Sequence, residues 1–213
     1  LIGTAAMVIF VDPYFHYHKP LSFLSYRIYE ERYVNDGISR HFTYDAVITG
    51  TSMAQNFKTS ELDELFGTHS VKEPFSGADF RELSENLNRQ EVKMVVMPLD
   101  YNALLQAADW QKYEEYPTYL YDNNIFNDAR YVWNKTIFYH GVVADLLRTV
   151  SGEPSTTMDE YSSWEHETGL EHIMASYTRE DQHPVEDPSF NEEDRKMVEE
   201  NITKNIVDLV NRY

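Results

Sequence analysis

Residues 44–57 read YDAVITGTSMAQNF and join a short apolar run to a segment with the composition of a helix. The run Ala46-Val47-Ile48 predicts a buried β-strand, and Gly50 followed by small polar residues marks its end. A strand followed at once by a helix puts Ser52 at the carboxyl edge of a sheet, where open α/β sheets bind ligands. Free N–H groups at the start of that helix favour negative charge beside the Ser52 hydroxyl. The stretch therefore predicts an α/β fold with Ser52 as a candidate nucleophile.

Ser52 also fits a purely structural role. Residues 52–55 match a capping box, in which a serine side chain accepts a hydrogen bond from a free N–H group at the start of a helix. On this hypothesis Ser52 caps the helix and takes no part in chemistry. The residues at the ends of the other predicted strands bear on the choice between the two hypotheses, and both stay open.

Two further strands are predicted downstream. Residues 70–78, SVKEPFSGA, read as a short strand and a turn that contains Gly77. Residues 92–99, VKMVVMPL, read as a buried strand, which Asp100 and Asn102 follow. Helix-like segments at 53–66 and 79–89 separate the three strands. This βαβαβ pattern predicts a parallel sheet with right-handed crossovers.

In order and residue type, these strand ends resemble the SGNH (GDSL-like) hydrolases, whose sheet carries serine, glycine, asparagine and histidine in successive blocks. Thr51 departs from the family's first block, where aspartate is most common. The resemblance implies a three-layer, flavodoxin-like parallel sheet with helices on both faces.

The resemblance also implies the roles of the residues. Ser52 would be the nucleophile, and the Gly77 N–H and the Asn102 side chain would stabilise the oxyanion, with Asp100 as the second choice at the third block. The family's last block, Asp-x-x-His, has no match. The nearest substitute ends at His183, which we take as the fallback histidine.

The carboxyl-terminal end of the sequence is short for this fold. A helix is expected over residues 191–211, and no strand follows it. Three predicted strands are fewer than the roughly five of a doubly wound sheet. We therefore expect the remainder of the domain, and the family's histidine with it, to lie beyond Tyr213.

The function implied by the resemblance is serine-dependent ester hydrolysis or O-acyl transfer on acylated cell-surface or exported polysaccharide, without a cofactor. The alternative is a catalytically inactive scaffold of this fold that binds glycan or a protein partner outside the cell. A third hypothesis is a substrate-binding α/β domain in which Ser52 is only a helix cap.

Composition excludes several classes of function. The chain has 213 residues, of which 42% are hydrophobic, enough for one sizeable core. Its formal net charge of −18 argues against nucleic acid and against anionic lipid headgroups. No cysteine is present, which excludes disulfides and thiolate catalysis. His16 and His18 would share one side of a strand but lack a third ligand, so we expect no bound metal.

The amino-terminal residues 1–11 are apolar apart from Gly3 and Thr4. They are too few to span a bilayer, which takes about 20. They fit the outer end of a transmembrane anchor, the remnant of a signal peptide, or a buried strand. We favour the anchor, and with it a bacterial extracytoplasmic location, because residues 12–18 have the aromatic and polar character of a membrane-interface belt. Residues 20–42 are expected to form an arm, so that an amino-terminal region 1–43 precedes an α/β domain over 44–213.

An insertion is predicted at about 103–190, with a helix over roughly 134–150. Its aromatic residues fit two hypotheses: exposed rings that stack on sugars, or amphipathic side chains that pack the insertion itself. They are Trp110, Tyr113, Tyr116, Tyr119, Tyr121, Tyr131 and Trp133.

Overall fold

A computed structural model describes residues 2–77, 91–99, 104, 117–122, 124–164 and 191–207. Its sheet contains β1 (Ala46–Gly50), β2 (Ser70–Pro74) and β3 (Met94–Val96), all parallel, in the order β2-β1-β3. The three strands confirm the sequence prediction, and the fold is mixed α/β. Asp100, Asn102 and His183 lie outside the described residues, as does the helix expected over 79–89.

The register of the strands separates the two faces of the sheet. Val47 pairs with Val71 and Val95, and these side chains join the main hydrophobic core with Val34 and Ile38. On the other face, Ile48 and Val96 lie against the helix that follows β1. Because side chains alternate along a strand, these two sets of side chains lie on opposite faces of the sheet.

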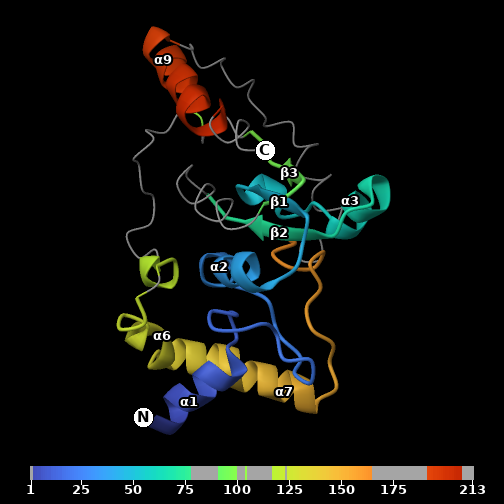
Figure 1. Cartoon of the computed structure of the whole chain (residues 1–213), viewed down its shortest axis with the longest axis vertical. Helices are drawn as coiled ribbons and strands as arrows, with labels where there is room; N and C mark the ends of the chain where they lie inside the picture. The colour runs from blue at the N-terminus through green and yellow to red at the C-terminus, as the bar shows by residue number, and fades with distance from the viewer. Residues whose placement is uncertain are drawn as a thin grey trace, which may run out of the picture.

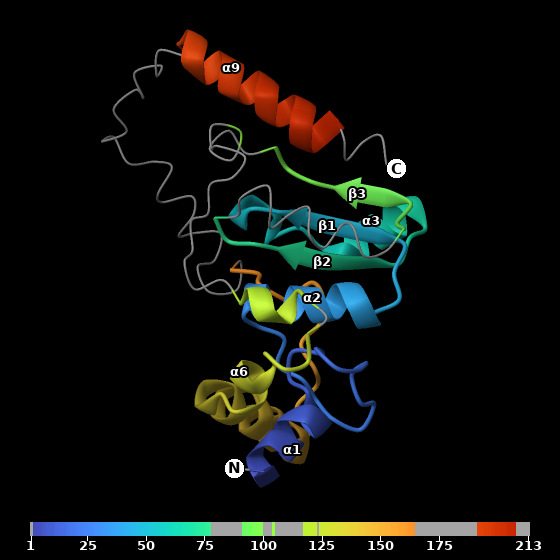
Figure 2. The same ribbon diagram turned by 60° about the vertical axis from the view of Figure 1, so that its left-hand side comes forward.

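Helix α2 (Glu31–His41) lies between the sheet and a second group of helices, and every residue from Val34 to Ser39 is buried (Figure 2). That second group, at the lower end of Figure 1, is formed by α1 and the helices of the insertion. The remaining elements are α1 (Ile2–Val11), η1 (Ser52–Ala54), α3 (Thr59–Phe66), η2 (Thr118–Leu120), α6 (Ala129–Val132), η3 (Ile137–Val143), α7 (Ala144–Val150), α9 (Glu192–Asn201) and η4 (Ile202–Val207).

The amino-terminal region differs from the expectations. The apolar segment at residues 1–11 forms helix α1, so the buried-strand alternative is wrong. The second half of the expected arm is helix α2, which packs on β2. Helix α1 has ten residues, and none of the helices that the structure describes has both the length and the apolar character needed to cross a membrane.

Residues 12–18 do not form a membrane-interface belt. Tyr14 and Phe15 are 2% and 1% exposed and lie in the core. The buried Asp12 carboxylate accepts hydrogen bonds from the backbone N–H groups of residues 16–18 and from the Tyr131 hydroxyl, at 2.7–3.0 Å. Burial raises the pKa of Asp12, although these hydrogen bonds oppose the rise. The aromatic pattern therefore arises from core packing.

In the insertion, the helix expected over 134–150 is confirmed as η3 followed by α7. Tyr131 is fully buried, as the packing hypothesis predicts, whereas Trp133 is 57% exposed. The helix expected over 53–66 is interrupted: η1 ends at Ala54 and α3 begins only at Thr59.

The segment that follows α1, around Tyr14 and Phe15, crosses α2 in very close contact with Gly37. A Cβ atom on Gly37 would lie 2.1 Å from the Tyr14 carbonyl oxygen and 2.7 Å from that of Phe15. A Cβ atom on Gly141 in η3 would likewise lie 2.7 Å from the Pro13 ring. Residues 13–15 are therefore held between two helices that each present a glycine.

We expect Gly37→Ala to destabilise the protein by about 3 kcal/mol or more, because the new methyl group would overlap backbone atoms that cannot rotate away. The matched control is Gly3→Ala in α1, where a Cβ atom would have no neighbour within 4 Å. That change should be neutral or stabilising by up to about 1 kcal/mol. Thermal unfolding followed by circular dichroism compares the two, and equal unfolding temperatures would contradict the close crossing.

A second prediction concerns Asp145, which is fully buried and accepts a hydrogen bond from the Arg27 N–H at 2.8 Å. Burial raises the pKa of Asp145 to about 7. Between about pH 4 and pH 7 the folded state binds a proton that the unfolded state has released, so stability falls as the pH rises through this window. Asp145→Asn removes that loss.

The unfolding temperature of Asp145→Asn minus that of wild type should therefore be several degrees larger at pH 8 than at pH 4. Each pKa unit corresponds to about 1.4 kcal/mol, and about 1 kcal/mol shifts the Tm by 2–4 °C in a chain of this size. Glu64→Gln, at an exposed position on α3, is the control. A difference that does not change with pH would show that Asp145 is ionised in the fold.

Candidate functional site

Ser52 lies two residues after the end of β1, separated from it by Thr51, and is exposed. It does not cap a helix: the cap of η1 is the buried Thr51, whose Oγ1 accepts a hydrogen bond from the Met53 N–H at 3.4 Å. Within the part of the chain that the structure describes, no hydrogen bond engages the Ser52 hydroxyl. The capping residue and the candidate nucleophile are thus neighbouring residues with separate environments.

Gly77 follows the end of β2, the strand beside β1. Gly50 pairs with Pro74, and the Phe75 N–H continues the ladder by donating to the Gly50 carbonyl at 2.8 Å. Gly77 then turns the chain with a φ of 63°, in the left-handed region. The ladder thereby brings Ser52 and Gly77 to the same edge of the sheet.

The end of β3 meets the end of β1 at Gly50. A Cβ atom on Gly50 would lie 3.1 Å from Pro98 Cδ, and its φ is 143°. This close approach sets the path of the chain through Leu99, which is 56% exposed, toward the two candidates at positions 100 and 102. All three strands therefore end at one edge, and the proposed third-block residues follow from it beyond the described segment.

Glu31, in the first turn of α2, forms hydrogen bonds with both the segment that follows β1 and the segment that follows β2. Its Oε1 accepts a hydrogen bond from Gln55 Nε2 at 2.6 Å, and its Oε2 accepts one from the Ser76 N–H at 2.5 Å. Arg32 completes the contact, since its Nη2 donates to the Ser76 carbonyl at 2.9 Å. The first turn of α2 thus fixes the backbone beside Gly77 and the turn that follows Ser52.

Lys72 supports the Ser52 turn from within the sheet. Its side chain is buried, and its Nζ donates to the Gln55 carbonyl at 2.6 Å and to the Asp159 carbonyl at 3.0 Å. Burial lowers the pKa of Lys72 to about 8, although the nearby carboxylates of Asp159 and Glu31 oppose the shift. A buried ammonium group therefore fixes the backbone three residues after Ser52.

Asp159 caps α3 from a distant part of the sequence. Its carboxylate accepts hydrogen bonds from Thr59 Oγ1 at 2.8 Å, from the Ser60 N–H at 3.0 Å and from Ser60 Oγ at 2.5 Å. Partial burial disfavours the ionised form, but these hydrogen bonds outweigh it and lower the pKa of Asp159. The segment after α7 is therefore part of the scaffold beneath the candidate site.

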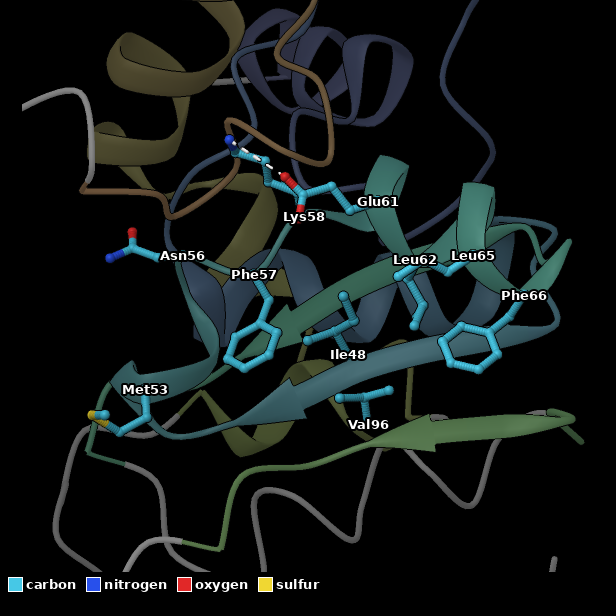
Figure 3. Close-up of a pocket in the computed structure, with 10 residues that line it drawn as sticks. All are labelled: Ile48, Met53, Asn56, Phe57, Lys58, Glu61, Leu62, Leu65, Phe66 and Val96. Carbon is cyan, nitrogen blue, oxygen red and sulfur yellow. Dashed lines mark ion pairs between the residues drawn. The ribbon is translucent and has the colours of Figure 1, made fainter.

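An open groove of about 790 Å³ begins at Met53, the residue after Ser52, and follows α3 along the sheet (Figure 3). Its floor is Ile48 and Val96. Among the described residues that line it, only Lys58 and Glu61 are charged, and they form an ion pair of 3.7 Å at the rim (Figure 3). An uncharged, apolar group suits this surface. The other lining residues are Asn56, Phe57, Leu62, Leu65 and Phe66.

No histidine in the described ranges follows the carboxyl end of a strand. His69 stands just before β2, at the opposite edge of the sheet. His16 is buried, with its Nε2 3.3 Å from Asp128 Oδ1, and does not share a strand face with His18. The same ranges contain no group of three acidic, histidine or cysteine side chains with the spacing of a metal site.

The sequence reasoning missed the residues that hold these loops in place, namely Glu31, Arg32, Lys72 and Asp159. A lysine within a strand that is expected to be buried, at position 72, was a usable signal, because a buried lysine needs carbonyl or carboxylate partners. The contacts of Glu31 and Asp159 join residues 24 to 100 positions apart and leave no local pattern.

No protein-family model, curated protein or solved structure matches this chain. The site is therefore interpreted from its own geometry.

We expect Asp159→Ala to lower the free energy of unfolding by about 1 kcal/mol, the usual effect of losing a helix cap. Glu64→Ala removes a carboxylate from the exposed side of the same helix and should change stability by less than about 0.5 kcal/mol. Urea unfolding at neutral pH compares the two variants. Equal stabilities would mean that Asp159 does not cap α3 in solution.

Proposed function

We propose that this protein is a serine-dependent ester hydrolase or O-acyltransferase of the SGNH type. The single observation that carries the proposal is the position of Ser52: exposed, engaged by no described hydrogen-bond partner, and at the carboxyl edge of a parallel sheet beside Gly77. Nucleophilic serines need an accessible hydroxyl near backbone donors.

The strand order supports the proposed fold. The order β2-β1-β3 is the one with which flavodoxin-like sheets begin, and in such sheets ligands bind where the strand order reverses, at the ends of β1 and β3. Ser52 follows β1 at this point. We propose that the complete domain is a three-layer, flavodoxin-like sheet with helices on both faces.

In the proposed mechanism, Ser52 Oγ attacks the ester carbonyl while a histidine accepts its proton. His183 is the fallback for this histidine. The developing oxyanion is stabilised by the N–H groups of Ser52 and Gly77 and by Asn102, with Asp100 as the second choice at that position. The alcohol leaves, and the acyl-enzyme passes its acyl group to water or to a sugar hydroxyl.

The proposed substrate is an acylated carbohydrate of the cell surface or an exported polysaccharide. The apolar groove that starts beside Ser52 supports an uncharged acyl group as one part of the substrate. Helix α1 supports the proposed attachment to a membrane, because it carries no charged residue and exposes Ile2, Ile9 and Phe10 by 86%, 45% and 54%. The extracytoplasmic side is proposed on the resemblance alone.

A second candidate function is an inactive scaffold of the same fold that binds glycan or a protein partner. Two observations favour it. Thr51 replaces the aspartate that is common in the family's first block, and no histidine follows a strand end within the described ranges. This candidate needs the same sheet edge but no activated serine.

Labelling with a fluorophosphonate probe distinguishes the two candidates. We expect wild-type protein to be labelled and peptide mapping to place the label on Ser52, because only an activated serine reacts rapidly with the probe. Ser52→Ala should lose the label, and Ser151→Ala, at an exposed position after α7, should retain it. Folded wild-type protein that takes no label would favour the inactive scaffold.

A further inference from the structure

The Ser76–Gly77 peptide is held by the first turn of α2 on both sides of Ser76. The Ser76 N–H donates to Glu31 Oε2 at 2.5 Å, and the Ser76 carbonyl accepts from Arg32 Nη2 at 2.9 Å. The arrangement fixes the position of Ser76 and the rotation of the peptide that follows it.

That rotation determines where the Gly77 N–H points. The peptide bonds of the described residues are trans, and in a planar trans peptide the C=O and N–H groups point in opposite directions. Because the Ser76 carbonyl is directed at Arg32, the Gly77 N–H is directed away from α2. It is therefore free of the helix that holds its peptide, and among the described residues no backbone acceptor engages it.

We infer that Arg32 is a positioning residue, which orients the Gly77 N–H as an oxyanion donor. The inference rests on the proposed function, since it assigns a task to that same site. Glu31 couples the two halves of the site, because the carboxylate that holds Ser76 also binds Gln55, three residues after the nucleophile.

The α2 turn is itself held in place. The Arg32 carbonyl accepts a hydrogen bond from the Tyr121 hydroxyl at 2.8 Å, and the Tyr33 N–H donates to the Glu30 carbonyl at 2.8 Å. Glu30 adopts a φ of 61°, which is unusual for a residue other than glycine. The turn therefore presents the Arg32 guanidinium to Ser76 from a fixed backbone.

The test uses the full chain and a p-nitrophenyl ester series, with active sites counted by fluorophosphonate labelling. Removing an oxyanion donor costs about 100- to 1000-fold in rate, so turning one away should cost less. We expect Arg32→Gln, whose amide is too short to reach the Ser76 carbonyl, to lower kcat per labelled site by about 10- to 100-fold with KM changed less than threefold.

Two comparisons separate positioning from folding. Arg32→Lys keeps a cation that reaches the Ser76 carbonyl and should recover at least tenfold of the lost kcat. Arg148→Gln is the matched control, since Arg148 Nε also donates to a backbone carbonyl, that of Pro154, but far from the sheet edge. Its kcat should equal that of wild type.

The outcomes are distinct. A wild-type kcat per site in Arg32→Gln would overturn the inference and leave the proposed function intact. Loss of activity that follows only the folded fraction, with kcat per site unchanged in both Arg32 variants, would also overturn it. Wild-type protein that neither takes the label at Ser52 nor hydrolyses the esters would overturn the proposed function, and the inference with it.

Discussion

The crossing of residues 13–15 over α2 is the constraint on which the rest of the structure depends. Gly37 lets the Tyr14 and Phe15 carbonyls approach the helix to within van der Waals contact, and Gly141 makes room for Pro13 on the opposite side. This places two aromatic side chains in the core, where they pack with residues of α2 and of the insertion. One side of helix α2 is therefore held by this crossing, and its other side packs against the sheet.

The same helix connects this core to the candidate site. Its middle is buried under the amino-terminal crossing, and its first turn reaches the carboxyl edge of the sheet, where Glu31 binds both the Gln55 side chain and the Ser76 backbone. A catalytic site needs its groups held within about half an ångström of the productive geometry. Here the loops that carry Ser52 and Gly77 are held by the side chains of Glu31 and Arg32, in the helix that precedes them in sequence.

The sequence was sufficient to predict the three strands, their parallel arrangement and the edge on which Ser52 and Gly77 lie, because β1 and β3 contain continuous apolar runs and glycine-containing polar turns follow β1 and β2. It was misleading at residues 12–18. There, aromatic and apolar residues were interpreted as membrane-facing, although Tyr14 and Phe15 are in the core. A sequence pattern records how apolar a segment is, not whether lipid or protein surrounds it. Contacts such as Glu31 with Ser76 depend on tertiary structure and have no sequence period.

The capping of α3 by Asp159 ties the segment after α7 to the sheet. The polypeptide leaves the sheet after β3, builds the helices of the lower layer, and returns so that residue 159 contacts the start of α3 and the Lys72 ammonium group. A variant that lacked this part of the chain would leave the start of α3 and the buried Lys72 ammonium group without these partners. Any change in this part of the chain therefore has to keep the contacts of Asp159 with the start of α3 and with Lys72, or replace both of them.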